Sequence, residues 1–415
     1  MPYLTKYLSL ILFICIVLVF IKQMYEYINQ KRHYTNSIEF INTENRFRNF
    51  IIIFCIAIIS RYVLYFVIYL LVYNPLVNTS FADALSGMLL RSDAPHYIDI
   101  AKDFYVNTGD ARYFIVFLPL YPVTVSALNY FIGNYILSAY IISDICLGIA
   151  CYFLYEVARP YIGSKGARHS VYLLLLFPVS FFLGGAFTES MFIMLCAIFF
   201  YLIDRDRYFP AAIIGFFAAL TRNVGFLLVV PYLIKLYFDL KPGRVRGYKT
   251  YLKYASFSLL IVLGMGVYIL INKLVTGNAF QFLVYAKEHW SQGLGFFPDS
   301  ISILTYRAII DAPEVSYTLF IPELISIFFV LLVMLFGAKH LKPHYFAYAI
   351  CYFIITMGAT WLLSAPRYLM ALLPLYIILG KVAAENKKEC IAIYIVFSAA
   401  LLYMTAAFSL GYYIY

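Results

Sequence analysis

The stretch Leu8–Ile21 reads LSLILFICIVLVFI and contains no charged residue. With its flanks it reaches the roughly 18–20 residues that a helix needs to cross a bilayer core of about 30 Å. Similar runs recur along the chain, in which 64% of residues are hydrophobic, 13% are charged and the mean hydropathy is +0.83. A typical soluble domain is only about 45–50% apolar. The sequence therefore predicts an all-α polytopic membrane protein embedded in a lipid bilayer.

The residues after this first run argue against a cleaved signal peptide. They read KQMYEYINQKRHY, which offers no small-residue cleavage site. We therefore expect residues 1–48 to form a retained transmembrane helix followed by a basic cytoplasmic loop. Residues 49–415 then form the main transmembrane domain.

Charge and cysteine content exclude several classes of protein. The net charge is +10, but the basic residues gather in short segments between apolar runs. That pattern is typical of cytoplasmic loops, so no nucleic-acid partner is predicted. Most of the seven cysteines lie inside apolar runs, without a CxxC pair or a Cys/His metal spacing. We predict no disulfide, no zinc site and no cofactor, and we assign no metal ligands; dependence on a divalent metal stays open.

The basic segments set the topology. Assigning all of them to the cytoplasm gives a bundle of about 12 transmembrane helices. These segments are Lys22–Arg48, Arg159–Arg168, Lys241–Lys253, Lys339–Lys342 and Lys381–Lys388. Two longer loops, 74–113 and 276–316, then lie outside. Three short polar turns, FTES, TRN and SAPRY, fall on that same outer side although the charge rule took no account of them.

One region resists this scheme. Phe114–Phe131 and Tyr135–Val157 have the length of two spans, yet the charge rule requires an odd number of crossings there. A re-entrant or interfacial segment at Phe114–Pro122 is one solution, and the number of crossings within 113–157 stays open.

The first outer loop contains a charged stretch, Arg91–Tyr105, which reads RSDAPHYIDIAKDFY. Ser92 or Asp93 is a suitable helix N-cap, and Pro95 fits the first turn. Apolar residues then recur at helical spacing, which predicts a short amphipathic helix on the membrane surface. Asp93 is therefore either a cap or a functional carboxylate, and the two alternatives have similar weight.

Other charged residues lie near the outer ends of spans. Glu189 in FTES is either an N-cap or a functional carboxylate, since a carboxylate so close to hydrocarbon needs capping, pairing or water. Arg222 in TRN and Arg367 in SAPRY oppose the positive-inside bias. Arginine binds phosphate with two parallel hydrogen bonds, and a lipid phosphate is the available anion at this depth. Carboxylates and cations together suit a reaction between an anionic lipid donor and a hydroxyl acceptor.

Several motifs in order resemble the PIG-V (GPI mannosyltransferase II) family and its prokaryotic relatives. RSDAPHY resembles the family's RWDxxHY, with Ser92 in place of the Trp and Asp93, His96 and Tyr97 retained. The other matching motifs are FLPLYP (117–122), FTES (187–190), ALTRNVG (219–225), TGNAFQFLVYAKEHW (276–290) and SAPRYLMALLP (364–374). The resemblance extends from about Phe50 to Pro374 and leaves the first span as an addition to the family core.

The resemblance implies a GT-C membrane glycosyltransferase. Such an enzyme transfers a sugar, by family default mannose, from a polyprenyl-phosphate-linked donor with inversion on the extracytoplasmic face. The acceptor would be a glycolipid, a cell-surface glycan or a protein, and the membrane would be a prokaryotic plasma membrane. The main domain would then be catalytic, with Asp93 as general base and Arg222 and Arg367 binding the donor phosphate. The pocket residues would be His96, Tyr97, Tyr121, Glu189, Trp290 and Tyr368.

Two other hypotheses remain. A lipid or solute transporter predicts charges near the bilayer midplane, and Arg61 and Asp144 do lie within spans. No repeat relates the two halves of the chain. A structural subunit that supports another enzyme would leave the ordered polar motifs without a role.

Overall fold

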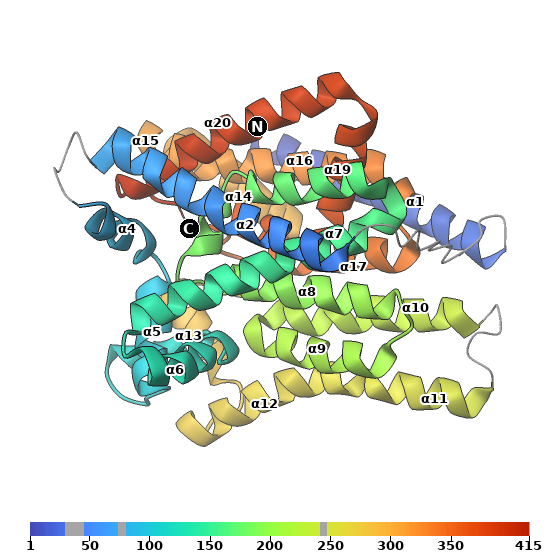
Figure 1. The fold of residues 1–415 in the computed structure, drawn as a ribbon, viewed down its shortest axis with the longest axis horizontal. Coiled ribbons are helices and arrows are strands. Elements are labelled where there is room, and N and C mark those ends of the chain that lie inside the picture. The colour runs from blue at the N-terminus through green and yellow to red at the C-terminus, as the bar shows by residue number, and fades with distance from the viewer. Residues whose placement is uncertain (30–44, 74–79, 241–246, 415) are drawn as a thin grey trace.

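The computed structural model describes residues 1–29, 45–73, 80–240 and 247–414, and these residues are predominantly helical (Figure 1). The predicted basic loops at 22–48 and 241–253 and the outer loop at 74–113 therefore lie partly outside the described residues. The α-helices are α1 (Pro2–Ile28), α2 (Arg46–Ile68), α4 (Phe81–Leu89), α5 (Ala94–Asp103), α6 (Leu120–Ile132), α7 (Tyr135–Leu175), α8 (Glu189–Ile203), α9 (Tyr208–Thr221), α10 (Val229–Leu240), α11 (Tyr248–Phe257), α12 (Leu259–Thr276), α13 (Gln281–Trp290), α14 (Phe297–Ile310), α15 (Pro313–Val315), α16 (Ile321–Gly337), α17 (Pro343–Met357), α18 (Ala365–Met370), α19 (Leu373–Glu385) and α20 (Lys387–Ser409). Shorter 3-10 or π-helical segments are η1 (Tyr69–Tyr73), η2 (Asp110–Val116), η3 (Ser180–Gly184), η4 (Asn223–Leu228), η5 (Ser316–Phe320) and η6 (Ala338–His340).

The lengths and composition of the helices confirm the all-α membrane class. Within the described residues, 6 helices are long and apolar enough to cross a bilayer: Pro2–Ile28, Arg46–Tyr73, Tyr135–Leu175, Tyr248–Thr276, Pro313–Gly337 and Lys387–Ser409. Helices α8 and α9 are apolar but only 15 and 14 residues long. The total of about 12 crossings stays a prediction, because it counts such shorter helices as spans.

The region with the open crossing number contains a sharp bend. Segment η2 and helix α6 meet at 111° across a short break, and only together are they long and apolar enough to cross a bilayer. Such a bend indicates either a broken span or a re-entrant segment, so a re-entrant segment at Phe114–Pro122 stays a prediction.

The basic segment Arg159–Arg168 contains a turn inside α7. Gly163 has φ 68° and ψ 172°, which breaks the helix. Both arms contact α2, because Tyr62 bonds Asp144 on the first arm and Arg61 bonds the Leu175 carbonyl on the second. Residues 144 and 175 lie at the same level of α2, so α7 is a helical hairpin with Gly163 at its tip.

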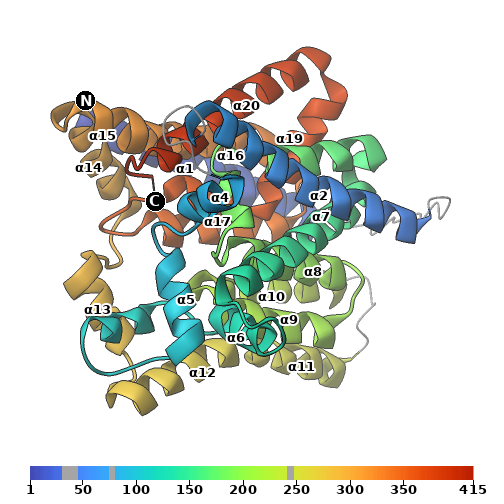
Figure 2. The same cartoon turned by 60° about the vertical axis from the view of Figure 1, so that its left-hand side comes forward.

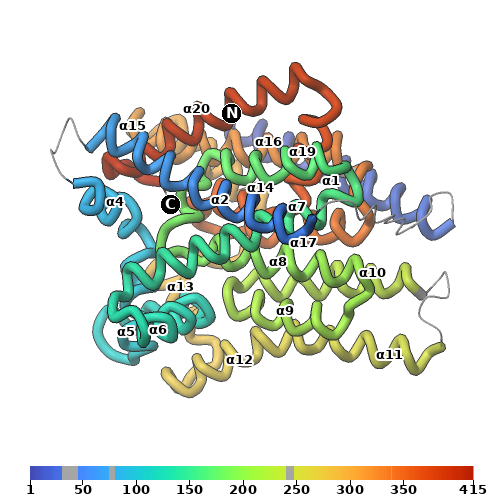
Figure 3. The backbone as a smooth tube through the Cα atoms, in the orientation of Figure 1, coloured from blue at the N-terminus to red at the C-terminus, as the bar shows by residue number. Residues whose placement is uncertain are grey.

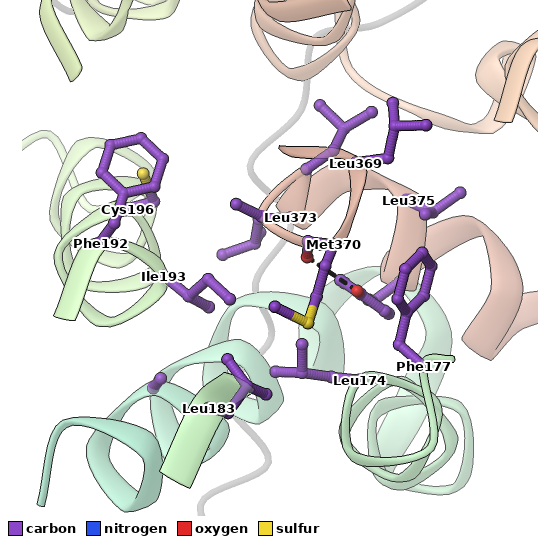
Figure 4. Close-up of a cluster of buried hydrophobic side chains, with 14 of the residues drawn as sticks. Leu174, Phe177, Leu183, Phe192, Ile193, Cys196, Leu369, Met370, Leu373 and Leu375 are labelled. Carbon is purple, nitrogen blue, oxygen red and sulfur yellow. Dashed lines mark hydrogen bonds between the residues drawn. The ribbon is translucent and has the colours of Figure 1, made fainter. Parts of the chain in front are cut away.

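The second arm of α7 packs closely against α19. A Cβ at Gly380 would lie 2.1 Å from the Ser170 hydroxyl and 2.6 Å from the Gly166 carbonyl. Small residues at such contacts let helix backbones approach, which is how helices associate in lipid. Beyond this contact, Figure 4 shows Met370 and Leu373 packed among apolar side chains of α7, η3 and α8. This cluster fixes α18, which carries Arg367, against α8, which carries Glu189.

Three of the other basic segments are linked to the hairpin tip by a series of contacts. Lys165 donates to the Ala384 carbonyl at 3.1 Å, and Lys381 contacts His340 at 2.9 Å. Gln23 donates to the Leu341 carbonyl. One end of the bundle, at the right in Figure 1, therefore gathers the ends of most of the predicted cytoplasmic loops.

The predicted outer loops contain helices. Helices α4 and α5 form the first, and α13 and α14 lie in the second; α5, α6 and α13 gather at the other end of the bundle (Figure 2). Helix α1 packs on α14, with the Phe13 and Phe297 ring centroids 5.1 Å apart. Helices α8, α9 and α12 lie side by side (Figure 3). The start of α8 and the end of α9 therefore lie at the same end of the bundle.

Candidate active site

Asp93 stands directly before α5 but does not cap it. Its carboxylate makes no cap hydrogen bond, and Pro95 occupies the first turn as predicted. The preceding residue, Ser92, has φ 56°, a conformation that is uncommon for a residue with a Cβ. Asp93 Oδ2 accepts a hydrogen bond from Arg367 Nη1 at 2.9 Å, and its side chain is 29% exposed. The carboxylate is therefore held by a guanidinium that is far away in the sequence, and it remains partly exposed to solvent.

Glu189 is the first residue of α8 and is completely buried. Its Oε1 accepts hydrogen bonds from Arg222 Nη1 at 2.7 Å and from Arg367 Nε at 2.9 Å, and it forms an ion pair with Arg367 Nη2 at 2.8 Å. Thr188 is the N-cap residue of α8, and no side chain caps this helix. The alternative in which Glu189 acts as a cap is therefore wrong. Its Oε2 is buried without a hydrogen-bond partner among the described residues.

Arg367 and Arg222 reach Glu189 from different elements. Arg367 lies on α18 and Arg222 follows the last residue of α9. Aromatic rings surround both guanidinium groups. The Cζ of Arg367 lies 4.5 Å from the Phe182 ring centroid, and that of Arg222 lies 5.3 Å from the Tyr368 centroid. Two carboxylates and two guanidiniums thus form a charge-balanced cluster, and each buried charge has an opposite partner.

Arg222 has unused hydrogen-bonding capacity. Its Nη1 binds Glu189, whereas within the described part of the chain no hydrogen bond involves its Nε or Nη2. Its side chain is 12% exposed. These groups can therefore donate hydrogen bonds to an incoming anion without breaking the pair with Glu189.

Glu323 is a site residue that the sequence analysis missed. It lies in the apolar run of α16 and is buried, and its Oε2 accepts the backbone N–H of Ala365 at 2.8 Å. That bond fixes the first residue of α18, two positions before Arg367. An acidic residue inside an apolar run was the available signal, because such residues are costly in membranes and usually have a function.

The predicted aromatic pocket residues form a wall beside Asp93. His96 lies against Phe114 with the ring centroids 4.4 Å apart, and Tyr97 lies 5.1 Å from Phe117. Trp290 joins this wall through Phe117, at 5.7 Å. Burial lowers the pKa of His96, although Asp93 and Asp99 partly oppose the shift. The neutral ring is therefore favoured.

Tyr121 and Tyr368 differ in how they relate to the cluster. Tyr121 is completely buried, and its hydroxyl contacts Ser143 at 2.9 Å. Its ring packs against the Tyr97 ring, with the centroids 5.6 Å apart. Tyr121 therefore supports the aromatic wall from the protein interior and does not line the site. The ring of Tyr368, in contrast, packs against the Arg222 guanidinium and therefore belongs to the cluster. No group of three or more His, Cys, Asp or Glu able to hold a metal occurs within the residues that the structure describes.

The mid-span charges Arg61 and Asp144 form separate local contacts. Arg61 donates to the Ser180 hydroxyl at 2.8 Å, and Asp144 accepts from Tyr62 at 2.9 Å. Both residues bond across the α2–α7 interface, and neither bonds the other. Both charged residues within the spans therefore have a structural role, because each hydrogen-bonds to a neighbouring segment.

Comparison with known proteins identifies the fold. No family model and no curated protein matches the chain. Among solved structures, ArnT from Cupriavidus metallidurans bound to undecaprenyl phosphate matches with a TM-score of 0.50 and 16% identity, over 76% of this chain and 62% of ArnT. The archaeal oligosaccharyltransferase AglB from Archaeoglobus fulgidus, in complex with an inhibitory peptide and a dolichol-phosphate, has a TM-score of 0.45 and 13% identity, over 87% of this chain and 55% of AglB.

The fold is that of the GT-C membrane glycosyltransferases. The chain spans less than two thirds of the length of these neighbours. The match to ArnT supports the fold that the PIG-V-like resemblance implied, whereas the PIG-V-like subfamily itself stays a prediction.

Proposed function

We propose that this protein is a glycosyltransferase that moves a sugar from a polyprenyl-phosphate-linked donor to a hydroxyl acceptor. The observation that carries the proposal is the bonded series Asp93–Arg367–Glu189–Arg222 within a GT-C fold. It combines a solvent-accessible carboxylate with a guanidinium that has free donors. These are the groups that transfer from a lipid phosphate requires.

Asp93 acts as the general base in this proposal. Arg367 holds Oδ2, while no hydrogen bond within the described residues involves Oδ1. Oδ1 takes the proton of the acceptor hydroxyl as the acceptor oxygen attacks the anomeric carbon of the sugar. The bond between that carbon and the phosphate oxygen breaks, and its electron pair leaves with the polyprenyl phosphate. Attack opposite the leaving group inverts the anomeric centre.

Arg222 receives the leaving phosphate. Its free Nε and Nη2 offer a planar pair of donors, which suits two oxygens of one phosphate. Glu189 keeps Arg222 and Arg367 in place and prevents their repulsion. Arg367 was predicted to bind phosphate as well, but its three nitrogens all bond carboxylates. We therefore propose that Arg367 mainly positions Asp93 and adds its positive charge to the site of the phosphate.

The sugar, acceptor and membrane side follow from the resemblance and the topology. We propose mannose as the sugar, and a glycolipid, a cell-surface glycan or a protein as the acceptor. The Asp93 cluster lies with the predicted outer segments, away from the end that gathers basic residues. By the positive-inside rule the reaction then takes place on the extracytoplasmic face of a prokaryotic plasma membrane.

The test is transfer of labelled sugar from polyprenyl-phosphate-mannose in membranes that contain either the native protein or Asp93→Asn. Asparagine keeps the size of the side chain and one acceptor oxygen for Arg367 but cannot take a proton. We expect transfer by the native protein and a loss of about 10²-fold or more with Asp93→Asn, as for other general bases. Equal transfer by both proteins at equal expression would overturn the role of Asp93.

The same assay tests the donor. A panel of lipid-linked sugars separates a wrong sugar from a wrong reaction, because another sugar would then be transferred in an Asp93-dependent way. Lack of transfer from every donor, together with movement of labelled lipid across the membrane, would favour a transporter instead.

A further inference from the structure

A cavity lies far from the Asp93 cluster, at the basic end of the bundle. It has a volume of about 210 Å³ and lies between α2 and the two arms of the α7 hairpin. Arg48 on α2 and Arg168 on the second arm line it together with the apolar residues Ile52, Ile56 and Val171. We call this cavity the α2–α7 groove.

The charges of the groove are not balanced by the protein. Within the described part of the chain neither Arg48 nor Arg168 forms an ion pair, and the only side-chain hydrogen bond of Arg168 runs from Nε to the Ser164 carbonyl at 3.3 Å. The nearby carboxylate of Glu156 is buried and pairs with Arg159 at 3.2 Å. Two guanidiniums on separate helices therefore face one groove and lack a carboxylate partner there.

The groove is polar at one end and apolar along its length. Arg48 lies in the first turn of α2, and Ile56 lies eight residues further, which is about 12 Å along the helix axis. Helix α2 is long and apolar enough to cross the bilayer, and Ile52 is 46% exposed, so the groove opens sideways toward lipid. A bound molecule must therefore carry an anionic group at the membrane surface and an apolar chain below it.

We propose that the α2–α7 groove binds one anionic phospholipid of the leaflet at the basic end of the bundle. The phosphate lies between Arg48 and Arg168, and an acyl chain follows Ile52 and Ile56. Basic pockets between transmembrane helices are known to bind anionic headgroups on the cytoplasmic side. The bound lipid links α2 to both arms of α7 and stabilises the hairpin. The groove itself is inferred without the proposed transferase activity, whereas the choice of a phospholipid over a polyprenyl phosphate rests on that proposed function.

A polyprenyl phosphate has the same two chemical parts, but the position of the groove disfavours it. The donor must reach Asp93 and Arg222, which lie with the outer segments, whereas the groove opens beside the hairpin tip at Gly163. The leaflet around the hairpin tip supplies abundant diacyl lipid, so a resident phospholipid is the occupant that we infer.

The test is native mass spectrometry of the purified full-length protein in detergent, titrated with phosphatidylglycerol or with phosphatidylcholine of the same acyl chains. We expect one phosphatidylglycerol to bind at least about tenfold more tightly than phosphatidylcholine, and to raise the melting temperature by mass action. Equal binding of the two lipids would overturn the proposal.

Variants locate the site. Arg48→Gln with Arg168→Gln should reduce phosphatidylglycerol binding to the level of phosphatidylcholine. The matched control, Lys249→Gln with Lys253→Gln, removes the same charge from exposed positions on α11 near the basic end and should bind as the native protein does. Ile56→Trp fills the groove without changing charge and should also reduce binding.

The remaining outcomes are also informative. Native-like binding by both the arginine pair variant and Ile56→Trp would overturn the site. Preferential binding of polyprenyl phosphate over phosphatidylglycerol, lost in the same variants, would overturn the choice of occupant. Circular dichroism and gel filtration identify a variant that fails to fold, and the variant that does fold then decides whether the lipid binds in the groove.

Discussion

Asp93 and Arg367 lie 274 residues apart in the sequence and are joined by a 2.9 Å hydrogen bond from Nη1 to Oδ2. The same guanidinium donates a hydrogen bond from Nε to Glu189 Oε1, and its Nη2 forms an ion pair with that oxygen. Arg367 therefore sets the distance between the exposed carboxylate and the buried one. This geometry explains why a planar side chain with several fixed donors stands at the start of α18.

Replacing Arg367 with Lys tests this bridging role. Lysine keeps the positive charge but presents one nitrogen, which cannot hold Asp93 and Glu189 in the same geometry. We expect sugar transfer to fall by about 10²-fold or more, as when a preorganised donor is lost, while KM for the donor changes much less. Steady-state kinetics at several donor concentrations separate the two effects. A large rise in KM with unchanged kcat would instead indicate direct binding of the donor by Arg367.

Removing the charge of Glu189 should destabilise the fold. Glu189→Gln leaves Arg222 and Arg367 side by side in a buried site, and loss of one partner of a buried pair costs about 3–5 kcal/mol. The additional change Arg222→Gln removes one of the unpaired charges, so the double variant should recover part of the loss. Unfolding of the four proteins in detergent gives the coupling between the two positions. If the two substitutions changed the free energy of unfolding additively, the bond between Arg222 and Glu189 Oε1 would be contradicted.

The sequence singled out the four residues that cluster in the structure, but not the contacts that join them. The positive-inside rule placed Asp93, Glu189, Arg222 and Arg367 on one side, because that rule depends only on charge and span length. It could not show that a single oxygen, Glu189 Oε1, joins both arginines, because side-chain pairing depends on how α8, α9 and α18 pack.

Local patterns were informative where local physics decides the structure. Helix α5 formed with Pro95 in its first turn, as the spacing of apolar residues predicted. Sequence pattern could not show whether Tyr121 faces the site or the interior, since a tyrosine at a helix start suits both places. Glu323 was missed because its role comes from contact with the N–H of Ala365, which is 42 residues away.

Gly225 holds the turn that carries Arg222. Its N–H donates to the Arg222 carbonyl at 2.8 Å, and a Cβ would lie 2.2 Å from the Ala218 carbonyl oxygen. Because backbone cannot move aside as a side chain can, Gly225→Ala should cost about 1–3 kcal/mol or more and displace Arg222. Gly266→Ala is the matched control, since its Cβ would meet only ordinary contacts inside α12. The control should be neutral or slightly stabilising; a melting temperature that fell equally in both variants would contradict the close contact at Gly225.

Burial of His96 should make stability depend on pH. Its pKa is lowered by burial, and the carboxylates of Asp93 and Asp99 only partly offset this, while His289 adds to the lowering. A lowered pKa means that the unfolded chain binds the proton more readily. The contribution to stability is therefore complete above the unfolded pKa of about 6.5 and is lost as pH falls below it.

The variant His96→Phe isolates this effect. Phenylalanine keeps the ring contact with Phe114 but cannot bind a proton. We expect the melting temperature of the native protein to fall more steeply than that of His96→Phe between about pH 7.5 and pH 5.5, the range in which histidine titrates. His289→Phe removes a neighbour that adds to the lowering of the His96 pKa, so its curve should lie between those of the native protein and His96→Phe. Parallel curves for the native protein and His96→Phe would show that His96 stays equally protonated in the folded and unfolded states.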